Sequence, residues 1–233
     1  MYYIIYDFET TGRSPRFDQI LQAGLICYDE NLKEVKRLNI RSRLNSDIIP
    51  SIGALRVNKL LVSDLLEERF TSYQMLIALS KFLEEFTPAT FLGYNSIHFD
   101  EEFLRQGFWE LFKNPYITST RNNLRGDVFN LCTVAHAFNS KSLNVEKNEE
   151  GKFNFKLESL SKINNFHAEN SHEAISDVIA TKEILSIIKN NCNNIYKNFI
   201  ENTNIAKLSV KIKESSYFTF YGYYFRVISV YKK

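Results

Sequence analysis

The stretch YDFETTG, residues 6–12, places two carboxylates one residue apart, directly after the apolar run YYII at residues 2–5. Side chains at positions i and i+2 of a β-strand point to the same face, so Asp7 and Glu9 are predicted to project together. Two like charges at this spacing repel each other unless water, a proton or a cation intervenes, and a divalent cation with oxygen ligands is a common solution. The pair therefore predicts either a metal site or a solvated strand end.

The composition is typical of one globular domain. The chain has 233 residues, 44% of them hydrophobic and 24% charged, with a formal net charge of only +2. This charge excludes binding of nucleic acid through a general basic excess, but it leaves a local basic groove open. The sequence has no signal segment, no apolar run of the roughly 18 residues that a membrane span needs, and three widely separated cysteines. We therefore expect a cytoplasmic protein with reduced thiols and no membrane contact.

The hydrophobic pattern divides the chain into strands near the N-terminus and helices further on. β-Branched and aromatic runs predict strands, and apolar residues at helical spacing predict helices. The polar residues 139–155 are expected to form an exposed excursion. The order of elements predicts an α/β fold. The predicted strands are residues 2–9, 19–28, 33–44 and 90–94, and the predicted helices are residues 63–70, 73–86, a segment after Asp100, 127–138 and 172–190.

A further acid stands in GYNSIHFDEEFLR, residues 93–105, where a predicted strand and loop give way to a helix. Asp is among the best residues for capping a helix N-terminus. Asp100 is therefore predicted to be either a helix cap or a third acid of the site formed by Asp7 and Glu9.

The stretch NSHEAISD, residues 170–177, opens the long helix predicted near the end of the chain. Asn170 and Glu173 have the spacing of a capping box. Asp177 lies one turn inside this apolar helix, where an unpaired charge would be costly. His172, at the start of the helix, could reach whatever Asp177 binds; the alternative is a solvated histidine.

Together, DFETTG, the acid in GYNSIHFD and the HEAISD segment resemble the three motifs of the DEDDh exonucleases, ribonuclease H-like proteins that remove nucleotides from 3′ ends. More narrowly, the chain resembles the exonuclease domain of the bacterial exodeoxyribonuclease I family over roughly residues 2–190. The stretches that carry this closer resemblance are GYNSIHFDEEFLR, NPY (114–116), RGDVFNLC (125–132), and FKLESLSKIN followed by HEAISDVIAT.

The resemblance implies a ribonuclease H-like mixed sheet flanked by helices, with a catalytic site that contains metal ions. It assigns the metal ions to four carboxylates and general-base catalysis to one histidine, which would take a proton from the attacking water. Two Mg²⁺ or Mn²⁺ ions are implied, because two cations can stabilise both the attacking and the leaving oxygen of a phosphodiester. The implied metal ligands are Asp7, Glu9, Asp100 and Asp177, and the implied base is His172.

The resemblance also implies contacts with the nucleic acid. The turn formed by Thr10, Thr11 and Gly12, next to Glu9, resembles the segment that receives the 3′-terminal nucleotide. Arg13 follows where many relatives have an apolar wedge, so this sequence departs from the family there. Positively charged or aromatic side chains suit phosphate pairing and base stacking, although each could equally be an ordinary surface residue. The implied substrate contacts are Glu9, Thr10, Thr11, Gly12, Arg105, Tyr116 and Lys156.

The C-terminal residues differ from the rest of the chain. Residues 1–200 are predicted to form the exonuclease domain, and residues 201–233 a short β-rich extension. The stretch SSYFTFYGYYFRVISVYKK, which ends the chain, is aromatic, strand-like and centred on Gly222. It is predicted to be either a hairpin or the opening strands of an SH3-like domain, and either a base-stacking platform or packing against the domain.

These features favour a metal-dependent 3′→5′ exonuclease that hydrolyses single-stranded DNA to nucleoside 5′-monophosphates in DNA repair. One alternative is an exoribonuclease of the same fold that trims RNA, because no residue unambiguously reads the 2′-hydroxyl. The other is a nucleic-acid-binding module that has kept the fold without catalysis. The sequence does not identify a protein partner.

Replacement of His172 by Ala tests its predicted role as a general base. We expect kcat to fall by about 10² to 10⁴-fold, because the side chain acts on the attacking water, while Mn²⁺ affinity is kept, because it is not a metal ligand. Single-turnover hydrolysis and calorimetric Mn²⁺ titration of the same preparation measure the two effects. A variant that loses Mn²⁺ affinity would contradict the assignment.

Overall fold

A computed structural model of the chain describes residues 1–166, 173–214, 217–221 and 228–232. Its centre is a five-stranded sheet with the strand order β3-β2-β1-β4-β5. The first three strands are antiparallel neighbours, whereas β4 and β5 run parallel to β1, so the sheet is mixed. The strands are β1 (Tyr2–Thr10), β2 (Ile20–Tyr28), β3 (Glu34–Arg41), β4 (Ala89–Gly93) and β5 (Leu124–Asp127).

Strand β1 occupies the middle of this sheet and sends apolar side chains to both faces. Ile4, Tyr6 and Phe8 belong to one hydrophobic cluster, and Tyr3 and Ile5 to a second cluster on the other side. This alternation is the period-two pattern of a strand that is covered on both faces. The predicted division of β1 into two faces is confirmed.

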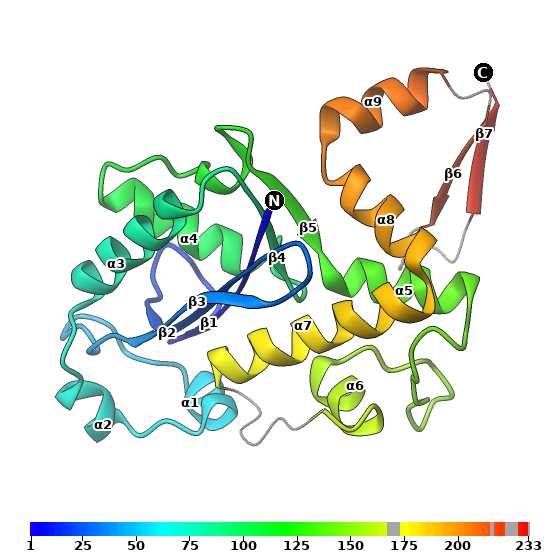
Figure 1. Cartoon of the computed structure of the whole chain (residues 1–233). Helices are drawn as coiled ribbons and strands as arrows, with labels where there is room; N and C mark the ends of the chain where they lie inside the picture. The colour runs from blue at the N-terminus through cyan, green and yellow to red at the C-terminus, as the bar shows by residue number, and fades with distance from the viewer. Residues whose placement is uncertain (167–172, 215–216, 222–227, 233) are drawn as a thin grey trace.

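Helices cover both faces of the sheet (Figure 1). Helices α3 (Ser72–Glu85) and α4 (Asp100–Glu110) pack against the cluster that contains Tyr6. Helices α5 (Val128–Phe138) and α7 (Ala174–Asn191) pack against the opposite cluster. The predicted α/β fold with flanking helices is therefore confirmed.

The remaining described elements surround this core. In the region that the structure describes, no helix combines the length and apolar character needed to cross a membrane. The three cysteines are free thiols. The other elements are the helices α1 (Ile52–Asn58), α2 (Val62–Glu67), η1 (Ile117–Ser119), α6 (Leu157–Ile163), α8 (Asn193–Asn202) and α9 (Ile205–Glu214), and a separate antiparallel pair, β6 (Tyr217–Tyr221) and β7 (Ile228–Lys232).

Three local predictions from the sequence are wrong. Helix α7 begins at Ala174 with Glu173 as its N-cap, so Glu173 does not occupy the N3 position of a capping box. Asn170, the predicted N-cap, lies outside the described residues. Phe99, not Asp100, takes the N-cap position of α4, and Asp100 is its first residue. The segment 139–155 is not wholly exposed, because Leu143 and Phe155 are buried in the cluster around α5 and α7.

The C-terminal extension is only partly β-rich. Its residues up to Glu214 are helical in α8 and α9, an amphipathic pattern that the sequence analysis missed. The two strands expected beyond them are present and pair antiparallel, while the predicted centre of the hairpin, Gly222, lies outside the described residues. The division into domains at residue 200 remains a prediction.

A glycine in β2 allows the start of α7 to lie close against the sheet. Gly24 pairs with Asp7 of β1. A Cβ atom at Gly24 would lie 2.6 Å from the backbone carbon of Ala174 and 2.6 Å from the backbone nitrogen of Ile175. Backbone atoms cannot move aside as a flexible side chain can, so the missing side chain lets α7 bring Asp177 over β1.

Replacement of Gly24 by Ala should destabilise the protein by about 1–3 kcal/mol, because the added methyl group overpacks the contact between β2 and α7. Gly53→Ala is the matched control: a Cβ atom at this α1 position meets nothing within 4 Å. Alanine in a helix is favoured over glycine, so the control should be as stable as the wild type or up to about 1 kcal/mol more stable. Urea unfolding followed by circular dichroism measures both, and a Gly24→Ala protein of wild-type stability would refute the close-approach argument.

Candidate active site

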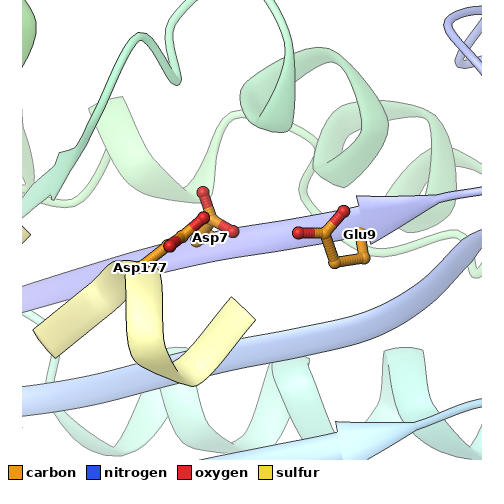
Figure 2. A group of neighbouring side chains, drawn as sticks. All are labelled: Asp7, Glu9 and Asp177. Carbon is orange, nitrogen blue, oxygen red and sulfur yellow. The ribbon is translucent and has the colours of Figure 1, made fainter. Parts of the chain in front are cut away.

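Three carboxylates from distant parts of the chain meet at the end of β1. Asp7, Glu9 and Asp177 each offer an oxygen atom, and these atoms lie within 4.8 Å of one another. Figure 2 shows Asp7 and Glu9 on β1 beside Asp177 on α7. The sequence predicted the shared face of Asp7 and Glu9, and the packing of α7 on β1 brings the third acid to it.

Asp100 lies beside this group without being one of its three members. Its Oδ1 atom accepts a hydrogen bond of 2.8 Å from the backbone N–H of Phe8, the residue between Asp7 and Glu9. The residue is only 4% exposed. The first turn of α4 is therefore fixed to the same short stretch of β1 that carries the first two acids.

The four acids repel one another strongly. Burial, followed by the charges of Asp100, Asp177 and Glu9, holds the pKa of Asp7 well above its usual range. Burial, then the charges of Asp177 and Asp100, raises the pKa of Glu9 to about 8.

The pKa of Asp100 is also raised to about 8, chiefly by burial, even though the hydrogen bond from Phe8 lowers it. The charges of Asp127 and Glu101 also raise it, so Asp100 is a buried acid among other acids.

This donor set fits a hard divalent cation. All four groups offer carboxylate oxygens, the ligands that Mg²⁺ and Mn²⁺ prefer, and none offers sulfur or nitrogen. A cation would also offset the repulsion that raises their pKa values. The residues present are therefore suited to metal binding.

Asp127 positions the loop that leads to Asp100, a role that the sequence analysis missed. Its carboxylate accepts backbone N–H bonds from Asn95 at 2.8 Å, Ile97 at 3.4 Å and Phe129 at 3.0 Å. Asp127 thus caps α5 and holds the loop between β4 and α4 with the same side chain. Its position just before an apolar helix signals the cap, but the link to the loop depends on the tertiary structure.

The turn that follows Glu9 is built from buried residues bonded within the protein. The hydroxyl of Thr10 donates to the carbonyl of Gly12 at 2.6 Å, and that of Thr11 donates to Asp18 at 2.9 Å. A Cβ atom at Gly12 would lie 2.5 Å from the carboxylate of Asp18. These contacts show that the residues of the turn stabilise its conformation. Binding of a 3′-terminal nucleotide by the turn remains a prediction.

The other predicted substrate contacts lie on the surface near α4 and α6. The guanidinium of Arg105 lies 5.4 Å from the ring centroid of Tyr116 and pairs with Glu102 at 2.5 Å. Tyr116 is 54% exposed. Lys156 is exposed at the N-cap of α6. Arg105 and Tyr116 are thus already in contact with each other, and the roles of all three in binding remain predictions.

Of the four histidines of the chain, two lie among the described residues. His172 lies outside the described residues, as does His167. Among the histidines that are described, His98 is exposed and His136 packs with its ring centroid 4.5 Å from that of Phe153. His136 is therefore a packing residue.

The fold is ribonuclease H-like, and acids from β1, α4 and α7 converge on its central strand. The chain belongs to the Exonuclease family, whose sequence model matches residues 4–185, and this family depends on divalent metal ions.

Among curated proteins, the chain is similar to two bacterial proteins called exodeoxyribonuclease I. The protein of Buchnera aphidicola subsp. Acyrthosiphon pisum is 32% identical over 189 residues, which cover 80% of this chain and 46% of the relative. The protein of Haemophilus influenzae is 29% identical over 204 residues, which cover 86% of this chain and 42% of the relative. The chain thus spans less than half the length of these relatives.

Among solved structures, the chain is similar to E. coli exonuclease I in complex with a dA16 oligonucleotide. The two superpose with a TM-score of 0.84 at 23% sequence identity, over 90% of this chain and 45% of that chain. The complex of the same enzyme with a dT13 oligonucleotide gives a TM-score of 0.85. This likeness shows that the fold is shared.

The raised pKa values predict how the stability of the metal-free protein depends on pH. Glu9 has a higher pKa in the folded state than its ordinary value, so its protonation favours folding, and this contribution is lost as pH rises through about 8. Glu9→Gln removes the charge. In EDTA at pH 9 we expect the variant to melt at least about 2 °C above the wild type, roughly 1 kcal/mol in a chain of this size.

That difference should shrink as the pH is lowered towards 5, where Glu9 is protonated in the folded wild type. Glu34→Gln is the control, because a hydrogen bond from Arg37 lowers the pKa of Glu34, the opposite direction. The control should not gain stability at pH 9. Thermal melts of the wild type and both variants across this pH range measure these differences in stability. A Glu9→Gln protein that is less stable than the wild type at pH 9 in EDTA would show that the acids are not under mutual repulsion.

Proposed function

We propose that this chain is a metal-dependent 3′→5′ exonuclease that hydrolyses single-stranded DNA to nucleoside 5′-monophosphates, and that it acts in DNA repair in the cytoplasm. The observation that carries the proposal is the meeting of Asp7, Glu9 and Asp177 within 4.8 Å, with Asp100 bonded to the backbone between the first two. The choice of DNA is supported by the relatives called exodeoxyribonuclease I and by the oligonucleotide complexes of E. coli exonuclease I.

The four carboxylates would hold two divalent ions, Mg²⁺ or Mn²⁺. When bound, such ions activate water and stabilise the charge on the leaving oxygen of a phosphodiester. The chain's own contribution is to aim Asp7, Glu9, Asp100 and Asp177 at one place. Packing of α4 and α7 on opposite faces of β1 achieves this aim.

His172 would accept the proton of the attacking water. The residue lies five positions before Asp177 in the sequence and two before the first residue of α7. A neutral imidazole near physiological pH suits this task, because its ordinary pKa lies close to 6.5.

The single-stranded DNA would reach the site along the surface near α4 and α6. Glu9 and the turn Thr10–Gly12 would receive the 3′-terminal nucleotide. Arg105 and Lys156 would pair with phosphates, and the exposed ring of Tyr116 would stack on a base.

Degradation of 5′-labelled oligonucleotides tests the proposal. Single-stranded DNA, RNA of the same sequence and duplex DNA are incubated with Mg²⁺, with Mn²⁺ or with EDTA, and the products are resolved by size. We expect single-stranded DNA to shorten from its 3′ end with release of nucleoside 5′-monophosphates, and no hydrolysis in EDTA. Faster loss of RNA would instead favour the exoribonuclease.

The variant Asp177→Asn ties this activity to the proposed site. It removes one ligand charge and should retain less than about a tenth of the wild-type rate. Asp64→Asn, which changes an exposed acid on α2, is the matched control and should keep the wild-type rate. If the wild type hydrolyses neither nucleic acid with either metal yet binds single-stranded DNA, the chain is a binding module without catalysis.

A further inference from the structure

Glu101, the residue after Asp100, is a buried acid that the proposed chemistry does not use. It is 1% exposed. Its Oε1 atom accepts a hydrogen bond of 2.6 Å from the hydroxyl of Tyr6, and its Oε2 atom accepts bonds from Thr118 at 2.8 Å and Arg125 at 3.0 Å. These donors belong to β1, η1 and β5, so one carboxylate on α4 connects four separate elements.

The bond between Tyr6 and Glu101 joins the immediate neighbours of two proposed metal ligands. Tyr6 precedes Asp7 on β1, and Glu101 follows Asp100 on α4. A second hydrogen bond between these stretches, from Phe8 to Asp100, uses an oxygen of the proposed ligand itself. The Glu101 link therefore holds α4 to β1 without occupying a carboxylate of the metal site.

Arg125 forms an ion pair with Glu101 inside the protein. Its guanidinium lies 3.0 Å from Oε2 of Glu101 and is 24% exposed, so it supplies a counter-charge inside the protein. A buried ion pair is often no more stabilising than apolar residues of the same volume. Stability alone therefore gives little reason for this pair, whereas fixing the distance between β1 and α4 requires a directional contact.

We propose that Glu101 is a positioning residue that, through Tyr6 and Arg125, fixes Asp100 relative to Asp7 so that the two carboxylates can share bound divalent metal. This inference rests on the proposed function of the site. Groups that orient metal ligands typically contribute about 10- to 100-fold to metal affinity or activity.

Tyr6→Phe removes the bond to Glu101 and keeps the ring, which packs against Phe8 and Phe91 with centroids 5.7 Å and 6.5 Å away. Calorimetric Mn²⁺ titration should show affinity lowered about 10-fold or more, and kcat should fall by a similar factor. The KM for single-stranded DNA should stay within about twofold, since no substrate contact is removed.

Tyr3→Phe is the matched control. Tyr3 is also buried on β1, at 6% exposure, but it faces the opposite cluster, and its hydroxyl bonds to Tyr196. This variant also loses one buried hydroxyl bond, so it reports any general effect of a weaker core. Its Mn²⁺ affinity should stay within about twofold of the wild type.

A second pair of variants tests the positioning role of Glu101 if the Tyr6→Phe variant does not fold. Arg125→Lys keeps a positive charge beside Glu101 and should retain most of the Mn²⁺ affinity. Arg125→Met leaves the carboxylate with only the more distant guanidinium of Arg105, 4.0 Å away, and should lower the Mn²⁺ affinity by about 10-fold or more. Mn²⁺ binding is measured on preparations shown to be folded by circular dichroism. If the Arg125→Met variant does not fold, the Arg125→Lys variant decides: retained Mn²⁺ affinity supports the proposal, and lost Mn²⁺ affinity overturns it.

Equal Mn²⁺ affinities in Tyr6→Phe and Tyr3→Phe, or in Arg125→Lys and Arg125→Met, would overturn the positioning role. A wild type that binds no Mn²⁺ would overturn the metal site itself and the inference with it. A wild type that binds Mn²⁺ normally, with all four variants unchanged, would leave the proposed function standing and remove only the role of Glu101.

Discussion

Repulsion among like charges is the constraint on which the rest of this structure depends. Asp7, Glu9, Asp100 and Asp177 gather around one end of β1, where burial first and neighbouring acidic groups second raise the pKa values of Asp7 and Glu9. Such a site persists only if the surrounding structure over-determines it. Both faces of β1 are accordingly covered by tightly packed apolar clusters.

The elements that carry the acids are fixed by contacts of different kinds. Helix α4 is held to β1 by hydrogen bonds, from Phe8 to Asp100 and from Tyr6 to Glu101. Helix α7 is instead placed by shape, because Gly24 leaves room for its first turn against the sheet. Directional bonds to β1 and close packing against β2 thus hold the two helices to the sheet, and a cation entering the site would meet ligands that are already in place.

Local patterns predicted the parts of the site that lie within one element. The i, i+2 spacing of Asp7 and Glu9 determined their common face, because the side-chain period of a strand is two. The apolar setting of Asp177 marked an acid that the structure places beside Asp7 and Glu9. Capping signals were less reliable. The N-cap of α4 is Phe99, one residue before Asp100, and the N-cap of α7 is Glu173, three residues after Asn170.

The sequence by itself determined which acids are candidates for the chemistry and on which kind of element each of them lies. Only the tertiary structure decided which of them meet. Asp7 and Asp177 are 170 positions apart in the sequence, and their proximity depends on the packing of α7 against Gly24 in the neighbouring strand β2. It also decided the partners of Glu101, which come from β1, η1 and β5. Strand and helix periods are local properties, whereas these contacts depend on how separate elements pack, and no local pattern records that packing.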